Sequence, residues 1–225
     1  MANTETTINA VINPEINETP IDIEKTIKAL ERNKFVVHYF ETGTEAVTYL
    51  KNRIQNKCVA IGDSRTLLEI GVHDALSEVN EDITDIQRPL PGESFRDTAL
   101  RTMGRDVFLT SVNALAQTGE MVNIDGTGNR VAASLFGSQE VFFVLGINKI
   151  TPDLASAIYR ARNVAAPLNS KKNKKSSLNP CATLEEKCYD CSSPDRICNA
   201  LTIYYKKMRN MQTMEVIIIN ESLGF

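Results

Sequence analysis

The sequence predicts an α/β fold in which a mixed central sheet is flanked by helices. Short apolar runs at residues 58–61, 140–145 and 214–219 alternate with segments whose apolar side chains recur every three or four positions. Such continuous apolar runs are typical of strands that are buried on both faces, as in parallel sheets. The length of 225 residues corresponds to a single domain with room for a sizeable core.

The expected elements follow in order along the chain. Helical spacing of apolar residues predicts helices near residues 23–30, 44–54, 67–70 and 95–104. Short apolar or β-prone runs predict strands at 35–40, 58–61 and 82–86. Four further runs predict a block of antiparallel strands at 106–110, 120–124, 131–135 and 140–145. Pro152 is expected to open a helix that Ala166 and Pro167 end, and a helix over 194–208 then precedes a strand over 214–219.

One domain is expected to span residues 21–225. Residues 1–20 are polar and lack both Lys and Arg, so they are interpreted as a tail and not as a signal peptide. Residues 170–198 begin with the basic run SKKNKKSS and go on to four cysteines, which indicates a linker and an insertion. No window approaches the roughly 18 consecutive apolar residues that a membrane span needs.

The charge balance limits the classes of partner. Twenty-five basic residues against 28 acidic ones give a net charge of −3, so no basic face is expected for nucleic acid. Five cysteines without an export signal indicate a reducing cytoplasm. The two histidines, His38 and His73, have no nucleophile or metal-ligand spacing around them and are interpreted as packed or surface residues.

Two glycine-containing regions are candidate ligand sites. Residues 62–66 (GDSRT) follow an apolar strand and precede a helix, where backbone amides favour anions; a plain N-cap by Asp63 or Ser64 is the alternative. Residues 118–120 and 126–130 also lie at turns, and the alternative there is a tight hairpin with an exposed Arg130.

We expect these loops to form one pocket, in which Arg130 and Lys149 neutralise the carboxylate or phosphate of a small metabolite. The residues expected to bind this anion are Gly62, Asp63, Ser64, Thr66, Thr118, Gly119, Gly128, Asn129, Arg130, Asn148 and Lys149.

Four cysteines near the C-terminal end have the spacing C-x6-C-x2-C-x6-C. They are Cys181, Cys188, Cys191 and Cys198. A C-x2-C pair with two flanking cysteines can supply four thiolates to zinc or to a [4Fe–4S] cluster, and the spacing does not choose between them. Inert thiols or a disulfide are the alternative. Cys58 begins an apolar strand and is expected to be a separate structural thiol.

Several stretches of the chain resemble the LUD-domain (lactate utilisation) family, the family of lactate utilisation protein C. They include VAIGDSRTLLEIGV, FLTSVNALAQTGEMVNIDGTGNRVAASLFG, VFFVLGINKITPDLASAIYRARNVAAPLN and the terminal VIIINESLGF. The segment PCATLEEKCYDCSSPDRICN looks like a subgroup of small stand-alone LUD proteins that carry four cysteines. It departs from plain lactate utilisation protein C, in which this motif is not expected.

The resemblance implies a fold like that of sugar-phosphate isomerases and CoA-transferases. It also implies a link to the oxidation of L-lactate to pyruvate, beside redox partner proteins with iron–sulfur and flavin-type centres. Our first hypothesis is therefore a redox or accessory protein with a [4Fe–4S] centre and an anionic ligand.

Two alternatives stay open: an enzyme acting on a phosphorylated or CoA-linked metabolite with Glu120 as carboxylate base or nucleophile, and a zinc-stabilised binding module without turnover. The sequence leaves the oligomeric state open, a homo-oligomer included.

Overall fold

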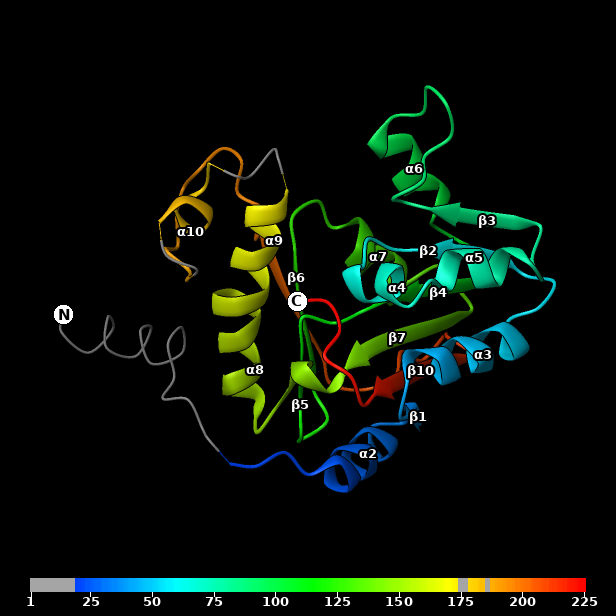
Figure 1. The fold of residues 1–225 in the computed structure, drawn as a ribbon, viewed down its shortest axis with the longest axis horizontal. Helices are drawn as coiled ribbons and strands as arrows, with labels where there is room; N and C mark the ends of the chain where they lie inside the picture. Colours follow the sequence, from blue (N-terminus) through cyan, green and yellow to red (C-terminus); the bar gives the residue numbers. More distant parts are fainter. Residues whose placement is uncertain (1–18, 174–177, 185–186) are drawn as a thin grey trace.

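The structure is a computed structural model that describes residues 19–173, 178–184 and 187–225. Most of the expected tail over residues 1–20 and part of the basic run, residues 174–177, lie outside the described residues. The described chain forms two sheets with helices around them, as Figure 1 shows.

A six-stranded parallel sheet forms the centre and confirms the α/β prediction. Its order is β1-β10-β7-β4-β2-β3, and every neighbouring pair is parallel. The strands are β1 (Val36–Phe40), β10 (Thr213–Ile219), β7 (Glu140–Gly146), β4 (Val107–Thr110), β2 (Cys58–Ile61) and β3 (Asp82–Asp85). The carboxyl ends of all six strands therefore point to one edge, where open α/β sheets bind ligands.

Helices cover both faces of this sheet (Figure 1). They are α2 (Ile23–Arg32), α3 (Gly43–Arg53), α4 (Arg65–Glu69), α5 (Val72–Ser77), α6 (Phe95–Arg101) and α7 (Asn129–Leu135). Strand β7 is apolar from Val141 to Leu145, because its alternate side chains enter two different cores. Phe143 packs in the core that contains Leu30 of α2, whereas Phe142 packs in the core that contains Leu50 of α3.

A second, four-stranded sheet has the order β8-β5-β6-β9. Its strands are β8 (Ile150–Thr151), β5 (Ala114–Ala116), β6 (Met121–Asp125) and β9 (Ala200–Tyr204). A continuous helical column packs beside it, made of α8 (Leu154–Arg160), the π-helical turn η2 (Ala161–Ala165) and α9 (Ala166–Lys172) (Figure 1). The short helix α10 (Pro180–Thr183) follows α9.

Two expected elements are wrong. Residues 131–135 are helical in α7 and not a strand, and their buried side chains are the small or β-branched Val131, Ala133 and Ser134. Within the helix predicted over 194–208, residues 200–204 instead form strand β9, which pairs with β6 and contains the β-prone residues Thr202, Ile203 and Tyr204. Local spacing could not show this pairing, since β6 lies about 80 positions earlier.

The helix that begins after Pro152 does not end at Pro167 as expected. Asp153 caps it, and the π-helical turn η2 joins α8 to α9, so that the helical column continues past Pro167. The predicted antiparallel block is also only partly correct: β4 and β7 belong to the parallel sheet, and β6 makes the antiparallel pairs, with β5 and β9.

Candidate functional site

A cavity of about 450 Å³ lies between the carboxyl edge of the central sheet and helix α9. Of the residues expected to bind an anion, those that line it are Asp63, Ser64, Asn129, Arg130 and Lys149. Ligand binding by these residues stays a prediction, but the structure brings them into one cavity. The volume is in the range of ordinary small-molecule sites.

Lys149 is the most unusual residue of this cavity. It ends the 3₁₀ turn η1 (Ile147–Lys149) after β7 and is only 4% exposed. Its Nζ donates to the hydroxyl of Thr66 at 2.9 Å and to the hydroxyl of Ser111 at 3.0 Å. Among the described residues, no carboxylate forms an ion pair with it. Burial, and then the charges of Arg160 and Arg130, lower the pKa of Lys149 to about 7.

Two arginines lie near this lysine, and most of their hydrogen bonds go to neutral oxygen atoms. Arg130 on α7 donates to the side-chain oxygen of Asn123 at 2.7 Å and to the carbonyl oxygen of Ile124 at 2.7 Å. Arg160 on α8 donates to the carbonyl oxygen of Asn148 at 3.0 Å, and burial lowers its pKa to about 10. Three basic side chains therefore gather here. Within the described part of the chain, Arg130 lies 3.5 Å from Asp125, and Arg160 donates to an oxygen of the terminal residue Phe225 at 3.3 Å.

The loop over residues 62–66 combines the two roles that the sequence left open. Ser64 caps α4, since its Oγ accepts from the Leu67 amide at 3.3 Å, and it also lines the cavity. Asp63 lines the cavity as well, and Thr66 contacts Lys149 directly. Gly62 continues the sheet by donating from its amide to the carbonyl oxygen of Leu109 at 2.8 Å.

Hydrogen bonds to Asp125 hold the loop between β6 and α7 in place. Asp125 Oδ1 accepts from the amides of Thr127 at 3.1 Å and Gly128 at 2.8 Å. Gly128 begins α7 with a φ of +85°, a conformation that glycine adopts without strain. This turn presents Asn129 and Arg130 to the cavity.

The structure does not bring residues 118–120 to this cavity, which corrects the expected single pocket. Strands β5 and β6 form a hairpin, and this turn lies at the end opposite to Asp125. Gly119 packs on α2, where its carbonyl oxygen accepts from Asn33 at 3.2 Å. Thr118 is exposed and donates to Glu120, and neither residue lines the cavity. Asn148 is also outside the lining; its side chain instead accepts from the Leu223 amide at 3.1 Å.

The C-terminal segment completes the site, and the sequence prediction missed it. The segment lies between the α8–α9 column and α4, as Figure 1 shows. Gly224 donates to Glu69 at 2.7 Å and has a φ of +65°; an added Cβ would lie 2.5 Å from Thr66 Oγ1. Phe225 lines the cavity, and Lys172 of α9 lies 4.4 Å from its ring centre. No local motif signals this role.

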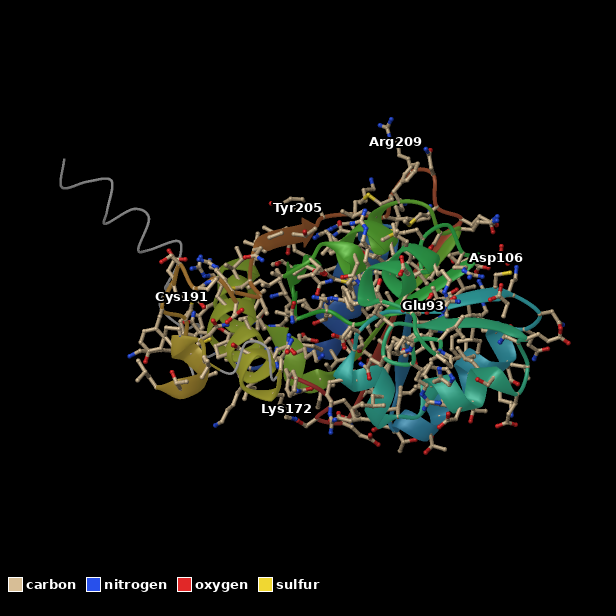
Figure 2. All side chains as sticks on the ribbon, turned by 90° about the horizontal axis from the view of Figure 1, so that it is seen from above. Glu93, Asp106, Lys172, Cys191, Tyr205 and Arg209 are labelled. Atoms are coloured by element: carbon tan, nitrogen blue, oxygen red, sulfur yellow. The ribbon has the colours of Figure 1, made fainter. Side chains whose placement is uncertain are left out.

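The four cysteines of the C-terminal insertion all line a second, small cavity of about 20 Å³. Arg162 and Arg196 line it with them; Arg162 lies 3.5 Å from the sulfur of Cys188, and Arg196 donates to the carbonyl oxygen of Cys191 at 2.6 Å. Burial raises the pKa of the Cys198 thiol. Figure 2 shows Cys191 on the side of the molecule that also carries Lys172, away from Glu93.

The cysteines converge without forming a ligand set. Within residues 19–173, 178–184 and 187–225, no group of three or more His, Cys, Asp or Glu side chains has the arrangement to hold a metal ion. All five cysteines are free thiols, and Cys58 stands apart from the other four at the start of β2.

Comparisons with known proteins agree on the family and the fold. The family model for the LUD domain matches residues 23–219. A crystal structure of a DUF162 family protein from Deinococcus radiodurans is similar, with a TM-score of 0.52 and 12% identity, over 89% of this chain and 99% of that one. Curated proteins give no match. In the part of the chain that the structure describes, no helix is both long and apolar enough to cross a bilayer.

Proposed function

Because the chain belongs to the LUD-domain family, we propose that it is a cytoplasmic accessory protein of lactate utilisation that binds a small anionic metabolite beside Lys149. The observation that carries this proposal is a buried lysine among hydroxyl groups and arginines, with no carboxylate paired to it in the described residues. An unpaired buried charge is costly, and an anionic ligand would supply the missing negative charge.

The contacts around Lys149 suit a carboxylate. The lysine can donate to one carboxylate oxygen, and the hydroxyls of Thr66 and Ser111 lie close enough to Nζ to share in the binding. Arg130 and Arg160 add positive potential while their own hydrogen bonds keep them in place. Ligand binding would also raise the pKa of Lys149, because a nearby negative charge favours the ammonium form.

Titration calorimetry with L-lactate, pyruvate and inorganic phosphate tests this proposal. We expect at least one of these anions to bind, and we expect Lys149→Met to weaken that binding by tenfold or more. Lys28→Met is the matched control, since Lys28 lies exposed on α2 and forms an ion pair with Glu24 of the same helix. No binding by any of the three anions, or equal affinity in Lys149→Met, would contradict the proposal.

A second proposal concerns the four cysteines, which we infer to be the ligands of one metal centre. Their convergence on one cavity supports it, and so do Arg162 and Arg196, which can offset thiolate charge. Four thiolates fit either a [4Fe–4S] cluster or zinc; the cluster would supply one-electron transfer with a redox partner protein, and zinc would stabilise the insertion. The four cysteine side chains would have to move closer together to bind a metal, because no three of the described His, Cys, Asp or Glu side chains are arranged to hold one.

Anaerobic purification followed by analysis for iron, sulfide and zinc tests this second proposal. Iron with sulfide would identify the cluster, and one zinc per chain would identify the structural metal. Cys188→Ser is expected to lose the metal, whereas Cys58→Ser, at the start of β2, retains it. A metal-free native protein, or full metal content in Cys188→Ser, would rule out the centre.

A further inference from the structure

A smaller cavity of about 110 Å³ adjoins the one that contains Lys149. The two share the lining residues Ser64, Leu68 and Gln87. We call the smaller cavity the annex and define it by Gly62, His73 and Asp85, together with those shared residues. It lies at the carboxyl ends of β2 and β3, where Ile61 pairs with Asp85.

His73 has a fixed orientation in the annex. Its Nδ1 lies 2.8 Å from Oδ2 of Asp85, a carboxylate that is only 7% exposed. Asp85 is itself held in place, because its Oδ1 accepts from the amide of Gln87 at 2.8 Å. The sequence analysis interpreted His73 as a packed or surface residue and missed this pair, because Asp85 lies on a different element from the histidine.

The Asp85 carboxylate also determines the chemistry of the ring. An ionised carboxylate can only accept hydrogen bonds, so Nδ1 of His73 carries the proton. In the neutral ring, Nε2 is then an acceptor. Among the described residues Nε2 has no hydrogen-bond partner, so it remains available to a donor such as a hydroxyl group.

The distance between the two subsites sets the size of the ligand. Ser111 follows β4 and Asp85 ends β3, with only β2 between these strands in the sheet. Two strand spacings separate them by about 10 Å. A longer hydroxylated chain spans this separation more readily than a three-carbon acid, in which only about three bonds of about 1.5 Å separate a carboxylate oxygen from the hydroxyl oxygen.

We propose that the annex binds the hydroxyl end of a polyhydroxylated anion whose charged group lies at Lys149. His73 accepts a hydrogen bond from a hydroxyl group of this ligand, and Asp85 positions the ring. Gln87 borders both cavities, and its side chain is held by Asp63 at 2.8 Å. The inference rests on the proposed function, since it names the class of ligand for the same cavity. His73 is thus a residue that determines specificity for long hydroxy acids over short ones.

Calorimetry with D-gluconate and L-lactate tests the inference, because both are hydroxy acids and they differ in the length of the hydroxylated chain. We expect the native protein to bind D-gluconate at least tenfold more tightly than L-lactate. His73→Phe is expected to abolish this preference and to leave the affinity for L-lactate within about twofold. His38→Phe is the matched control, because His38 also lies near a buried carboxylate, Glu215 at 3.3 Å, but on strand β1 and outside the lining of both cavities. This variant should keep the full preference.

Asp85→Asn provides a second variant that leaves the ring in place. The amide can donate to Nδ1, which moves the proton to Nε2 and removes the acceptor, so the preference should also fall. Equal affinity of the native protein for both acids, or an unchanged preference in both folded variants, would overturn the inference alone. If neither acid binds and the anions tested above do not bind either, the proposed function fails together with it.

Discussion

At the amino ends of the parallel strands, Glu140 and Glu215 are buried beside Arg53; at the carboxyl ends, Lys149 is buried beside hydroxyl groups. Arg53 forms ion pairs with both carboxylates and lies 3.0 Å from Glu215. Tyr49 donates to Glu215 at 2.8 Å, so the negative charges at this edge are matched by donors. No comparable match exists for Lys149 among the described residues, because its hydrogen-bond partners are the neutral Thr66 and Ser111.

The charges at the amino ends are compensated within the fold, whereas under our proposal the charge of Lys149 is compensated when an anionic ligand binds. Breaking a compensated pair leaves a buried charge alone, which destabilises a protein. Removing an uncompensated buried charge relieves that same penalty and stabilises it. Neutral substitutions at the two edges should therefore change stability in opposite directions.

The largest effect is expected at the carboxyl edge. At pH 6, where Lys149 is mostly charged, Lys149→Met should raise the free energy of unfolding by about 2–4 kcal/mol, since methionine fills the space without the charge. Urea unfolding of the native protein and the variant measures the change. A loss of stability in Lys149→Met would show that the lysine maintains the fold and would remove the contrast between the edges.

At the amino edge, Arg53→Met should lower the free energy of unfolding by about 2–3 kcal/mol. The value is below the usual range for broken buried pairs, because the Arg53 side chain is 33% exposed and Lys57 remains 3.7 Å from Glu140. Arg32→Met is the control on the exposed side of α2, with an expected change below about 0.5 kcal/mol. Equal free energies of unfolding for Arg53→Met and Arg32→Met would show that the ion pairs of Arg53 do not stabilise the protein.

The pH dependence of stability should also carry the signature of Lys149. Its pKa is about 7 in the folded protein and 10.5 ordinarily, so between these values the unfolded chain binds more protons. Stability due to this group therefore rises with pH from 7 to about 10, by at most about 1.4 kcal/mol per pH unit. The stability advantage of Lys149→Met should shrink over the same window. Parallel pH profiles of the two proteins would refute a lowered pKa.

The smallest effect is expected from the glycine that covers Lys149. Gly224→Ala places a methyl group against Thr66 at a φ of +65°, whereas Gly128→Ala meets nothing within 4 Å at a φ of +85°. Both should lose about 1 kcal/mol from backbone strain, and Gly224→Ala should lose about 1 kcal/mol more from the contact. Thermal unfolding compares the two. Equal losses would mean that the C-terminal segment moves away from Lys149 without cost.

The sequence predicted the features that depend on strand direction. The carboxyl ends of parallel strands share one edge, so the loops after β2 and β7 were expected near each other, and Asp63 and Lys149 do line one cavity. It could not predict features that depend on long-range pairing. Strand β9 was predicted as a helix because its partner strand β6 is distant in the sequence. Residues 118–120 lie away from the cavity because they close the hairpin of β5 and β6. Arg160 was missed since nothing local marks it as part of the site.

The decisive measurement is the pKa of Lys149, because an uncompensated buried ammonium group has a lowered pKa. It can be measured by ¹³C NMR of labelled lysine side chains, assigned with Lys149→Met, in the free protein and with added L-lactate. We expect a pKa near 7 in the free protein, and we expect this pKa to rise when the anion binds because the ammonium form gains a counter-charge. A value near 10.5 that the anion does not change would contradict an uncompensated charge at the carboxyl edge of the sheet.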